Sequence, residues 1–265
     1  MFDQLSGKMF IDGNFVVGQG RSITVENPAT LESIGAITLA TTDEIDAAVA
    51  AARKAFPAWA AAPARTRSSA LHRLGDAIAA DVDTMARIMT VEQGKPLNEA
   101  RGEILKLAEA CHFYAEEALR VHGEIVPNDT ADSESHVVRE PIGVVGAITP
   151  WNYPAELIGW KLCGALAAGC TIVVKPAELT PFTGLAIAAK AKEANIPAGV
   201  VNVVTGSGPT VGQALVEHPD IDKIAFTGSS AVGLHIQNTC PQIKRMSLEL
   251  GGNCPMIVTA KAGLA

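Results

Sequence analysis

The second half of the chain alternates short apolar runs with amphipathic stretches. Strands are predicted at 143–148, 171–175, 200–204, 223–226 and 246–248. Helical spacing separates them at 155–168, 181–194, 209–217 and 230–239. Continuous β-branched strands with helices between them need cover on both faces of the sheet. The pattern therefore predicts a doubly wound parallel α/β sheet over residues 141–253.

The first half has a different pattern. Apolar residues at 9–11 and 15–17 flank Asp12-Gly13-Asn14, which predicts a hairpin because Gly and Asn tolerate positive φ. Thr41 and Glu44 have the spacing of a capping box before a helix. Further helices are predicted at about 64–80, 83–92 and 97–120, with a helix stop at 93–96. Residues 121–140 are polar and extended, and indicate a long two-stranded excursion.

Composition narrows the class of protein. The chain has 265 residues, of which 48% are hydrophobic and 18% charged, as in soluble globular proteins. Its formal net charge of −7 argues against nucleic-acid and anionic-membrane partners. No apolar run approaches the ~20 residues that span a bilayer. The first residues carry no basic, apolar leader, so we expect a cytoplasmic protein.

The cysteines and histidines favour no metal site. The five cysteines are widely spread and form no CxxC pair, which indicates reduced thiols. The histidines show no HExxH spacing. We therefore expect no bound metal. We also expect 254–258 to form a strand in which Cys254 packs.

Candidate chemistry follows the first two of these strands. Thr149-Pro150-Trp151-Asn152-Tyr153-Pro154 places an amide side chain in a loop stiffened by proline; a plain turn with a packed Trp explains it equally well. Lys175-Pro176-Ala177-Glu178 sets a cation and a carboxylate three residues apart. Such a pair suits a ribose, although a solvated Lys–Glu pair is the commoner case.

The last two strands end in glycine-containing segments. Phe226-Thr227-Gly228-Ser229 leads into a helix whose first N–H groups can receive a phosphate, yet such turns often exist for geometry alone. Leu248-Glu249-Leu250-Gly251-Gly252-Asn253 holds a carboxylate between leucines, where partial desolvation would suit a general base; the alternative is a capping Glu. Each of the four motifs has an ordinary structural explanation when taken alone. Those explanations do not account for the four motifs occurring together in this order.

Together these motifs resemble the NAD(P)-dependent aldehyde dehydrogenase superfamily. The resemblance runs from Ile11-Asp12-Gly13 to Val258 and includes Glu92-Gln93-Gly94-Lys95-Pro96 and Phe113-Tyr114-Ala115. It implies a Rossmann-like cofactor-binding domain, with 1–120 as its N-terminal hairpin and helices and 141–253 as its core. It further implies that 121–140 serves oligomerisation and that 254–265 begins a catalytic domain.

The resemblance also implies roles for single residues. Asn152 matches the amide that stabilises an oxyanion, and Glu249 the general base that activates water. Lys175 and Glu178 match the residues that hold the adenosine ribose, and Gly228 and Ser229 those that lie under the pyrophosphate. The other positions matched to cofactor contacts are Thr149, Trp151, Asn152 itself, Ala177, Gly208, Gly212, Phe226, Val232 and Leu250. We expect NAD rather than NADP, because the Glu178 carboxylate would repel a 2′-phosphate.

The sequence departs from the family in two places. The family's nucleophilic cysteine lies in a Gly-Gln-x-Cys-type segment beyond the Glu-Leu-Gly-Gly motif, and none of the five cysteines here matches it. After Val258 the family commonly continues with an acidic run, whereas this chain reads Thr259-Ala260-Lys261-Ala262-Gly263-Leu264-Ala265. A frameshift, an early stop and a deliberately chosen end point all explain this tail. We therefore expect only the N-terminal part of such an enzyme, inactive alone.

The resemblance implies an aldehyde substrate, and the sequence leaves the chemical nature of the aldehyde's tail undecided. Arg101-Gly102-Glu103 and Gly123-Glu124-Ile125-Val126-Pro127 resemble the succinate-semialdehyde branch. Semialdehyde-specific members tend to have a basic residue before the Lys that matches Lys161, where this chain has Trp160, which favours an apolar or aromatic tail. The full-length form is expected to be a homo-oligomer. The alternatives are a non-catalytic dinucleotide-binding or oligomerising fragment and a poorly folded product of a disrupted reading frame.

Overall fold

The structure is a computed structural model and describes residues 2–130 and 132–263 of the chain. Its centre is a sheet with the strand order β11-β10-β7-β8-β9-β1-β2. The five strands β7 to β11 are parallel, while β1 pairs antiparallel with β9 and β2. Their bounds are β1 Lys8–Ile11, β2 Asn14–Val17, β7 Val144–Ile148, β8 Thr171–Lys175, β9 Val201–Val203, β10 Lys223–Thr227 and β11 Arg245–Glu249. The predicted parallel α/β sheet is confirmed, within about a residue or two at each strand end.

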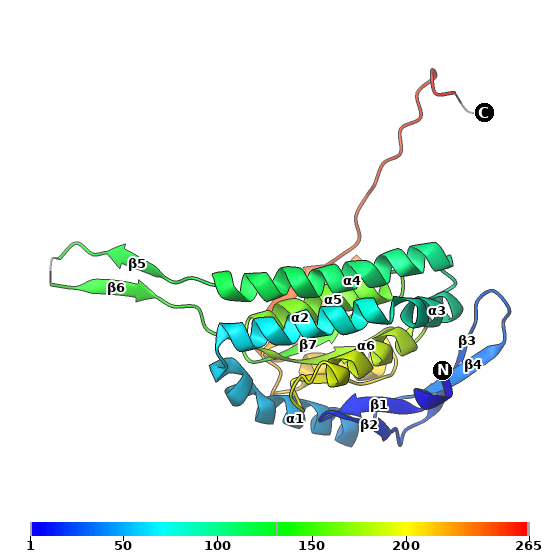
Figure 1. Ribbon diagram of the computed structural model, residues 1–265, viewed down its shortest axis with the longest axis horizontal. Coiled ribbons are helices and arrows are strands. Elements are labelled where there is room, and N and C mark those ends of the chain that lie inside the picture. Colours follow the sequence, from blue (N-terminus) through cyan, green and yellow to red (C-terminus); the bar gives the residue numbers. More distant parts are fainter. Residues whose placement is uncertain (1, 131, 264–265) are drawn as a thin grey trace.

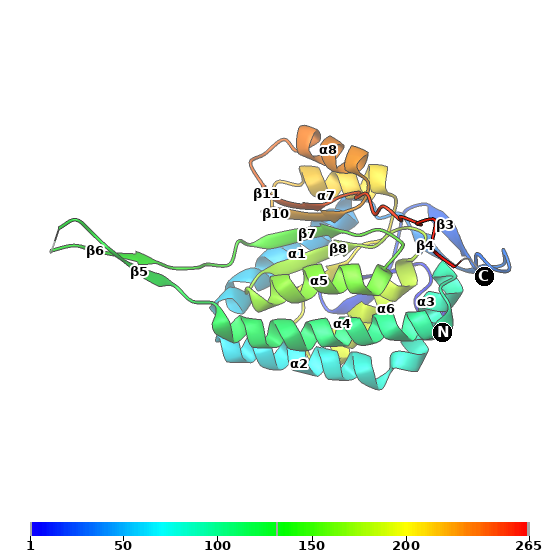
Figure 2. The ribbon, with the colours of Figure 1, turned by 90° about the horizontal axis from the view of Figure 1, so that it is seen from above.

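Helices cover both faces of this sheet (Figures 1 and 2). On one face lie α5 and α6, with α2, α3 and α4 packed outside them; on the other lie α1, α7 and α8. Their bounds are α1 Thr42–Ala61, α2 Ala64–Ala80, α3 Val82–Gln93, α4 Leu97–Glu117, α5 Pro154–Ala167, α6 Pro181–Glu193, α7 Gln213–Glu217 and α8 Ser230–Thr239. The predicted helix 209–217 is a π-helical turn, η3 Gly208–Gly212, followed by the short α7, and 3-10 turns stand at η1 Phe2–Gln4 and η2 Ala118–Arg120.

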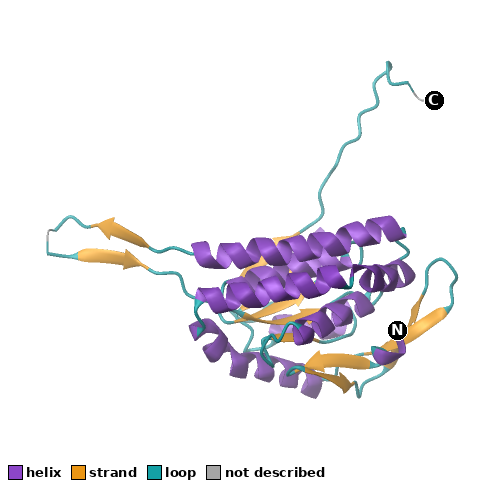
Figure 3. Ribbon diagram, in the orientation of Figure 1, coloured by secondary structure: helices purple, strands orange, loops and turns teal. Residues whose placement is uncertain are grey.

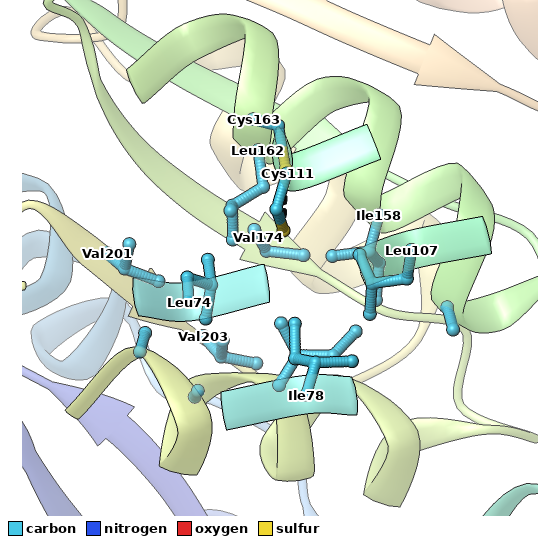
Figure 4. Close-up of a cluster of buried hydrophobic side chains, with 14 of the residues drawn as sticks. Leu74, Ile78, Leu107, Cys111, Ile158, Leu162, Cys163, Val174, Val201 and Val203 are labelled. Atoms are coloured by element: carbon cyan, nitrogen blue, oxygen red, sulfur yellow. Dashed lines mark hydrogen bonds between the residues drawn. The ribbon is translucent and has the colours of Figure 1, made fainter. Parts of the chain in front are cut away.

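The strands divide their side chains between two cores. In β8, Ile172 and Val174 belong to the core under α5 and α6, whereas Val173 belongs to the core under α1. This alternation follows from the two-residue period of a strand. Figure 4 shows the first core, in which Leu74 of α2, Leu107 of α4 and Ile158 of α5 meet the sheet near Val174. Because both faces of β8 are covered, its three consecutive residues 172–174 are all apolar and buried.

Local signals set the N-terminal elements. The capping box of α1 is present: the Thr41 side chain accepts from the Glu44 N–H, and the Glu44 carboxylate accepts from the Thr41 N–H. The helix α3 ends at Gln93 because Gly94 adopts φ +84°, a left-handed conformation that favours glycine. A second hairpin, β3 Ser22–Glu26 and β4 Ser33–Thr38, stands beside the central sheet.

The predicted excursion is a hairpin of β5 Glu124–Pro127 and β6 Glu134–Val137. It stands away from the body (Figure 1), and all of its strand residues are exposed. Among its apolar side chains, Ile125 is 64% exposed. A lone two-stranded hairpin is marginally stable in water, so this one gains from a packing partner.

The expected strand at 254–258 is wrong. Residues 250–259 form no strand or helix (Figure 3), and Cys254 is exposed rather than packed. An apolar run becomes a strand only where a neighbour receives its hydrogen bonds and covers one face. No other described element pairs with this segment.

Candidate functional site

The candidate site lies where the strand order reverses. The chain passes from β7 to β8 and β9 on one side and then returns to β10 and β11 on the other. Ligands of such sheets bind beyond the carboxyl ends of the strands at this reversal. The predicted motifs stand at those ends: Asn152 follows β7, Lys175 ends β8, and Glu249 ends β11. The register pairs Ile148 with Lys175 and Thr227 with Glu249, so the strand ends are level.

A cavity of about 860 Å³ opens on the α5 side of β10 and β11. The structure brings Asn152, Trp160, Lys161, Glu249 and Leu250 together in its wall. Apolar and aromatic side chains form most of the remainder, namely Tyr114, Pro141, Ile142, Val145, Tyr153, Leu157, Ala165, Ala168, Cys170 and Ala225. A large apolar cavity with a few convergent polar groups is the usual form of a small-molecule site.

Lys161 and Lys223 are the two lysines in the wall of this cavity, and Lys161 is the one whose pKa is influenced by Glu249. Its Nζ donates a hydrogen bond to the Thr227 hydroxyl at the end of β10. Burial lowers the pKa of Lys161 to about 8, and the nearby Glu249 carboxylate partly opposes that shift. The strongest physical effect is therefore the loss of hydration of the ammonium group. A lysine with this pKa exchanges its proton near neutral pH.

Asn152 and Glu249 face the cavity from the carboxyl ends of two different strands, Asn152 from the loop after β7 and Glu249 from the last residue of β11. Both side chains are exposed, and Asn152 lies in the short bend between β7 and α5. The expectation that Glu249 is partly desolvated is wrong for this structure, because β11 is an edge strand and leaves the carboxylate in solvent. The flanking leucines explain the failed expectation: Leu248 turns into the core under α8, while Leu250 lies against Gly233.

The predicted ribose pair is present in a partly buried form. The Lys175 side chain is only 2% exposed; its Nζ donates to the Gly206 carbonyl and lies 3.5 Å from the Glu178 carboxylate. Burial lowers the pKa of Lys175, and Glu178 partly opposes this. Ala177, between them in sequence, is buried. A Cβ added to Gly212 would lie 3.7 Å from Cδ of Lys175, which is ordinary van der Waals contact. Gly208 has no neighbour within 4 Å of such a Cβ, so its side of η3 is open.

The turn into α8 requires glycine. A Cβ on Gly228 would come within 2.4 Å of the Phe226 ring, which is buried beneath the turn. Phe226 therefore supports the turn with its ring. Ser229 caps α8 by accepting from the Val232 N–H at 3.3 Å, and Val232 is exposed beside it. The open N-terminus of α8, a helix of 10 residues, attracts anions through its free N–H groups and its dipole.

These residues fit a dinucleotide. The hydroxyl of Thr149, at the end of β7, is buried and has no partner among the described residues. Lys175, Glu178 and the Gly228–Ser229 turn flank it along the strand ends. The donor set therefore combines a hydroxyl, a cation, a carboxylate and helix N–H groups, which suits ribose and pyrophosphate.

The site has a second hollow. A cavity of about 450 Å³ is lined by Trp151, Glu178, Thr180 and Gln93, together with the β3–β4 hairpin. Trp151 and Asn152 thus face different cavities although they are adjacent in sequence. Glu178 belongs to the second cavity and Asn152 to the first.

Three of the five cysteines are buried, and of these Cys170 lines the 860 Å³ cavity. Cys111 and Cys163 are buried with their sulfur atoms 3.4 Å apart (Figure 4), and Cys170 is buried at the start of β8. Cys240 is half-buried as the C-cap of α8, one residue beyond the helix. Among residues 2–130 and 132–263, no three His, Cys, Asp or Glu side chains are placed to hold a metal ion. None of the helices in these ranges is long and apolar enough to cross a membrane.

The sequence did not lead us to predict that two carboxylates are buried. Glu103 lies on the buried face of α4, next to Ile104 and four residues before Leu107, and it is 4% exposed. Glu92 lies on the buried face of α3, after Met89, and its carboxylate accepts from the Phe182 N–H at 2.7 Å. A charged residue at an apolar position of a helical pattern is the signal that identifies such groups.

Comparison with known proteins shows the family. A sequence model of the aldehyde dehydrogenase family matches residues 15–265. Similar proteins include a glutarate-semialdehyde dehydrogenase of Pseudomonas aeruginosa, 46% identical over 257 residues, and the NADP(+) succinate-semialdehyde dehydrogenase GabD of Escherichia coli, 46% identical over 256. The alignments cover 96% of this chain and 53% of each relative. The chain belongs to the aldehyde dehydrogenase family and spans about half the length of these relatives.

Solved structures agree with this assignment. The NAD+ complex of an aldehyde dehydrogenase from Bacillus cereus superposes with a TM-score of 0.93 at 41% identity, covering 98% of this chain and 54% of that one. An NADP-dependent enzyme of Escherichia coli superposes with a TM-score of 0.92 at 45% identity, covering 94% and 52%. The predicted resemblance and fold class are therefore confirmed.

Proposed function

We propose that this chain is the cofactor-binding half of an enzyme that oxidises an aldehyde to the acid with NAD(P)+. The observation that carries the proposal is the shared cavity in which Asn152, Lys161 and Glu249 meet at the carboxyl ends of the strands. The amide can donate to an oxyanion that develops on a carbonyl, and the exposed carboxylate can accept a proton from water, so these groups suit carbonyl chemistry with water.

Lys175 and Glu178 would hold the adenosine ribose, and Gly228 with Ser229 would receive the pyrophosphate. The remaining predicted contacts are Thr149, Trp151, Ala177, Gly208, Gly212, Phe226, Val232 and Leu250. When bound, the cofactor supplies the hydride acceptor of the oxidation. NAD is preferred in this proposal, because the Glu178 carboxylate is 39% exposed at the position where a 2′-phosphate would approach.

The chain's own polar groups take separate roles. The Asn152 amide donates to the substrate oxygen as negative charge develops there. Oxidation of an aldehyde bound to the family's nucleophilic cysteine would leave an acyl group on that sulfur. Glu249 would accept a proton from the water that attacks this acyl group and releases the acid, and its exposure gives it access to that water. Lys161 donates to the Thr227 hydroxyl, and it lies close enough to Glu249 for the carboxylate charge to raise the pKa of the lysine against the effect of burial.

The substrate in this proposal has an apolar or aromatic tail. Trp160 and Tyr114 are both in the cavity wall, with ring centroids 6.1 Å apart. The Trp160 N–H is engaged by the Glu156 carboxylate at 3.3 Å, so its ring face is left for the ligand. Ligand-observed NMR with benzaldehyde and succinate semialdehyde tests this, and tighter binding of the semialdehyde would contradict it.

The homo-oligomer remains part of the proposal. The exposed apolar residues Ile125 and Val138, at 64% and 72% exposure, lie in the hairpin and just after it, where a second copy can cover them. Light scattering across a concentration range tests self-association. A monomer at every concentration would count against this part.

Calorimetric titration of NAD+ into the purified chain tests the main proposal. We expect binding by the wild type and loss of binding in Lys175→Met, because that buried ammonium is replaced by an isosteric apolar chain. Lys54→Met, on the exposed surface of α1, is the matched control and should bind like the wild type. Absence of binding in a folded wild-type chain would overturn the assignment.

A further inference from the structure

We propose that Lys95 and Glu103 are positioning residues for Asn152, which they hold from outside the cavity. The inference rests on the proposed role of Asn152 and adds the part of the molecule that fixes its position. The two residues come from the α3–α4 connection and from α4, far in sequence from the loop that they hold. Their side chains meet at the start of α5, directly behind that loop.

Glu103 caps α5 from a neighbouring helix. The N-cap residue of α5, Tyr153, makes no side-chain cap of its own. Instead one Glu103 carboxylate oxygen accepts from the Ala155 N–H at 2.8 Å and the Glu156 N–H at 3.2 Å. The side chain is 2% exposed, so these bonds have almost no competition from water. The first turn of α5 is thereby fixed relative to α4.

Lys95 joins this carboxylate to the Asn152 loop. Its Nζ forms an ion pair with the other Glu103 oxygen and donates to the Asn152 carbonyl at 3.0 Å. The same Nζ lies 3.9 Å from the centre of the Tyr153 ring. Gln93 adds a second donor to the Asn152 carbonyl, from Nε2 at 3.2 Å. One buried ammonium thus contacts Asn152, its neighbour Tyr153 and the cap of the next helix.

This arrangement fixes the backbone from which the Asn152 side chain projects. Two donors on the Asn152 carbonyl, and a cap on the N–H groups three and four residues further on, leave the 152–153 backbone little freedom. The Asn152 carboxamide lies in the wall of the 860 Å³ cavity, and within the described residues it makes no hydrogen bond of its own. An amide that must donate to a developing charge is effective only where its position is fixed beforehand. Here the hydrogen bonds to the Asn152 backbone carbonyl restrict the position of the residue before a ligand binds.

The test follows the Asn152 carboxamide by NMR. Its side-chain signals are assigned by their loss in Asn152→Asp. In Lys95→Met we expect these side-chain signals to shift together with the ¹³C signal of the Asn152 carbonyl, because the ammonium that donates to that carbonyl is lost. Lys95→Arg keeps the charge and should restore the signals in part. Lys106→Met, an exposed lysine of the same helix α4, should change neither.

Glu103→Gln provides a second route if Lys95→Met does not fold. The amide oxygen can still accept from the Ala155 N–H, but the ion pair with Lys95 is lost. We expect the same displacement of the Asn152 signals while the Ala155 amide stays protected. Unchanged Asn152 signals in Lys95→Met or Glu103→Gln would overturn the inference, as would a general loss of signal dispersion in both. NAD+ binding is measured in a separate titration. A chain that fails to bind NAD+ can therefore still show whether Lys95 and Glu103 position Asn152.

Discussion

The ammonium group of Lys161 in α5 donates a hydrogen bond to the hydroxyl of Thr227 at the end of β10. This bond ties the helix after β7 to the strand on the other side of the reversal in strand order. It also sets a cation beside the Glu249 carboxylate, which raises the pKa of Lys161 against the larger lowering by burial. Lys161 therefore links α5, the end of β10 and the carboxylate at the end of β11 within the candidate site.

Lys161 should titrate near neutral pH. With burial lowering its pKa to about 8, we expect one dimethyl-lysine signal to titrate there in ¹³C NMR of the reductively methylated chain, and to vanish in Lys161→Arg. Glu249→Gln should lower the pKa further, because the opposing carboxylate charge is removed. A wild-type spectrum in which every lysine titrates near 10 would contradict the burial argument.

Glu92 should make stability fall as pH rises. Burial raises its pKa from 4.5 to about 8, so between these values the folded chain binds a proton that the unfolded chain has released. The stabilising contribution is full below the unfolded pKa and is lost through the folded one, by at most about 1.4 kcal/mol per pH unit. Urea unfolding from pH 5 to 8.5 measures this slope. Glu92→Gln should flatten it, whereas Glu99→Gln, exposed at the start of α4, should leave it unchanged.

Glu178 should govern the choice of cofactor. Its repulsion of a 2′-phosphate should favour NAD+ over NADP+ by about 1–3 kcal/mol, or roughly 5- to 150-fold in affinity. Glu178→Ser should narrow the gap in a calorimetric titration with both cofactors. Equal or tighter binding of NADP+ by the wild type would refute the preference.

Gly228→Ala should disturb the turn into α8. The added Cβ would meet the buried Phe226 ring at 2.4 Å, and overpacking of this kind costs about 1–3 kcal/mol. We expect a lower urea midpoint and weaker NAD+ binding. Gly208→Ala is the matched control for the urea midpoint only, since a Cβ there meets nothing within 4 Å but Gly208 is itself a predicted cofactor contact. Equal midpoints for the two variants would show that the ring moves aside.

The chain alone should not form NADH from aldehydes. Hydride leaves readily from a carbon already bonded to sulfur. Cys111 and Cys163 are fully buried, and Cys170 lines the cavity but is only 3% exposed, which leaves an aldehyde little access to its thiol. Cys254 is the exposed thiol. Absorbance at 340 nm with several aldehydes checks this. Turnover that persists on purification and disappears in Cys254→Ala would identify a displaced nucleophile.

Much of the fold was predictable because its signals are local. The strand 171–175 and the helix 64–80 were predicted at their observed bounds, and the capping box of Thr41 was present as expected. Periodicity and capping act over a few residues, and the later packing agrees with them. The segment 254–258 failed because an apolar run has no structure of its own without a neighbouring strand.

The sequence by itself determined the parallel sheet, its family and the motifs at the strand ends, because each depends on residues close together in the chain. Tertiary structure alone decided that β1 joins β9 antiparallel and extends that sheet. It alone also decided that Trp151 and Asn152 face different cavities, that Glu249 is exposed, and that Glu103 and Lys95 meet behind Asn152. Burial, and the charge–charge distances that follow from it, depend on contacts between residues more than 50 positions apart, as between Lys95 and Asn152.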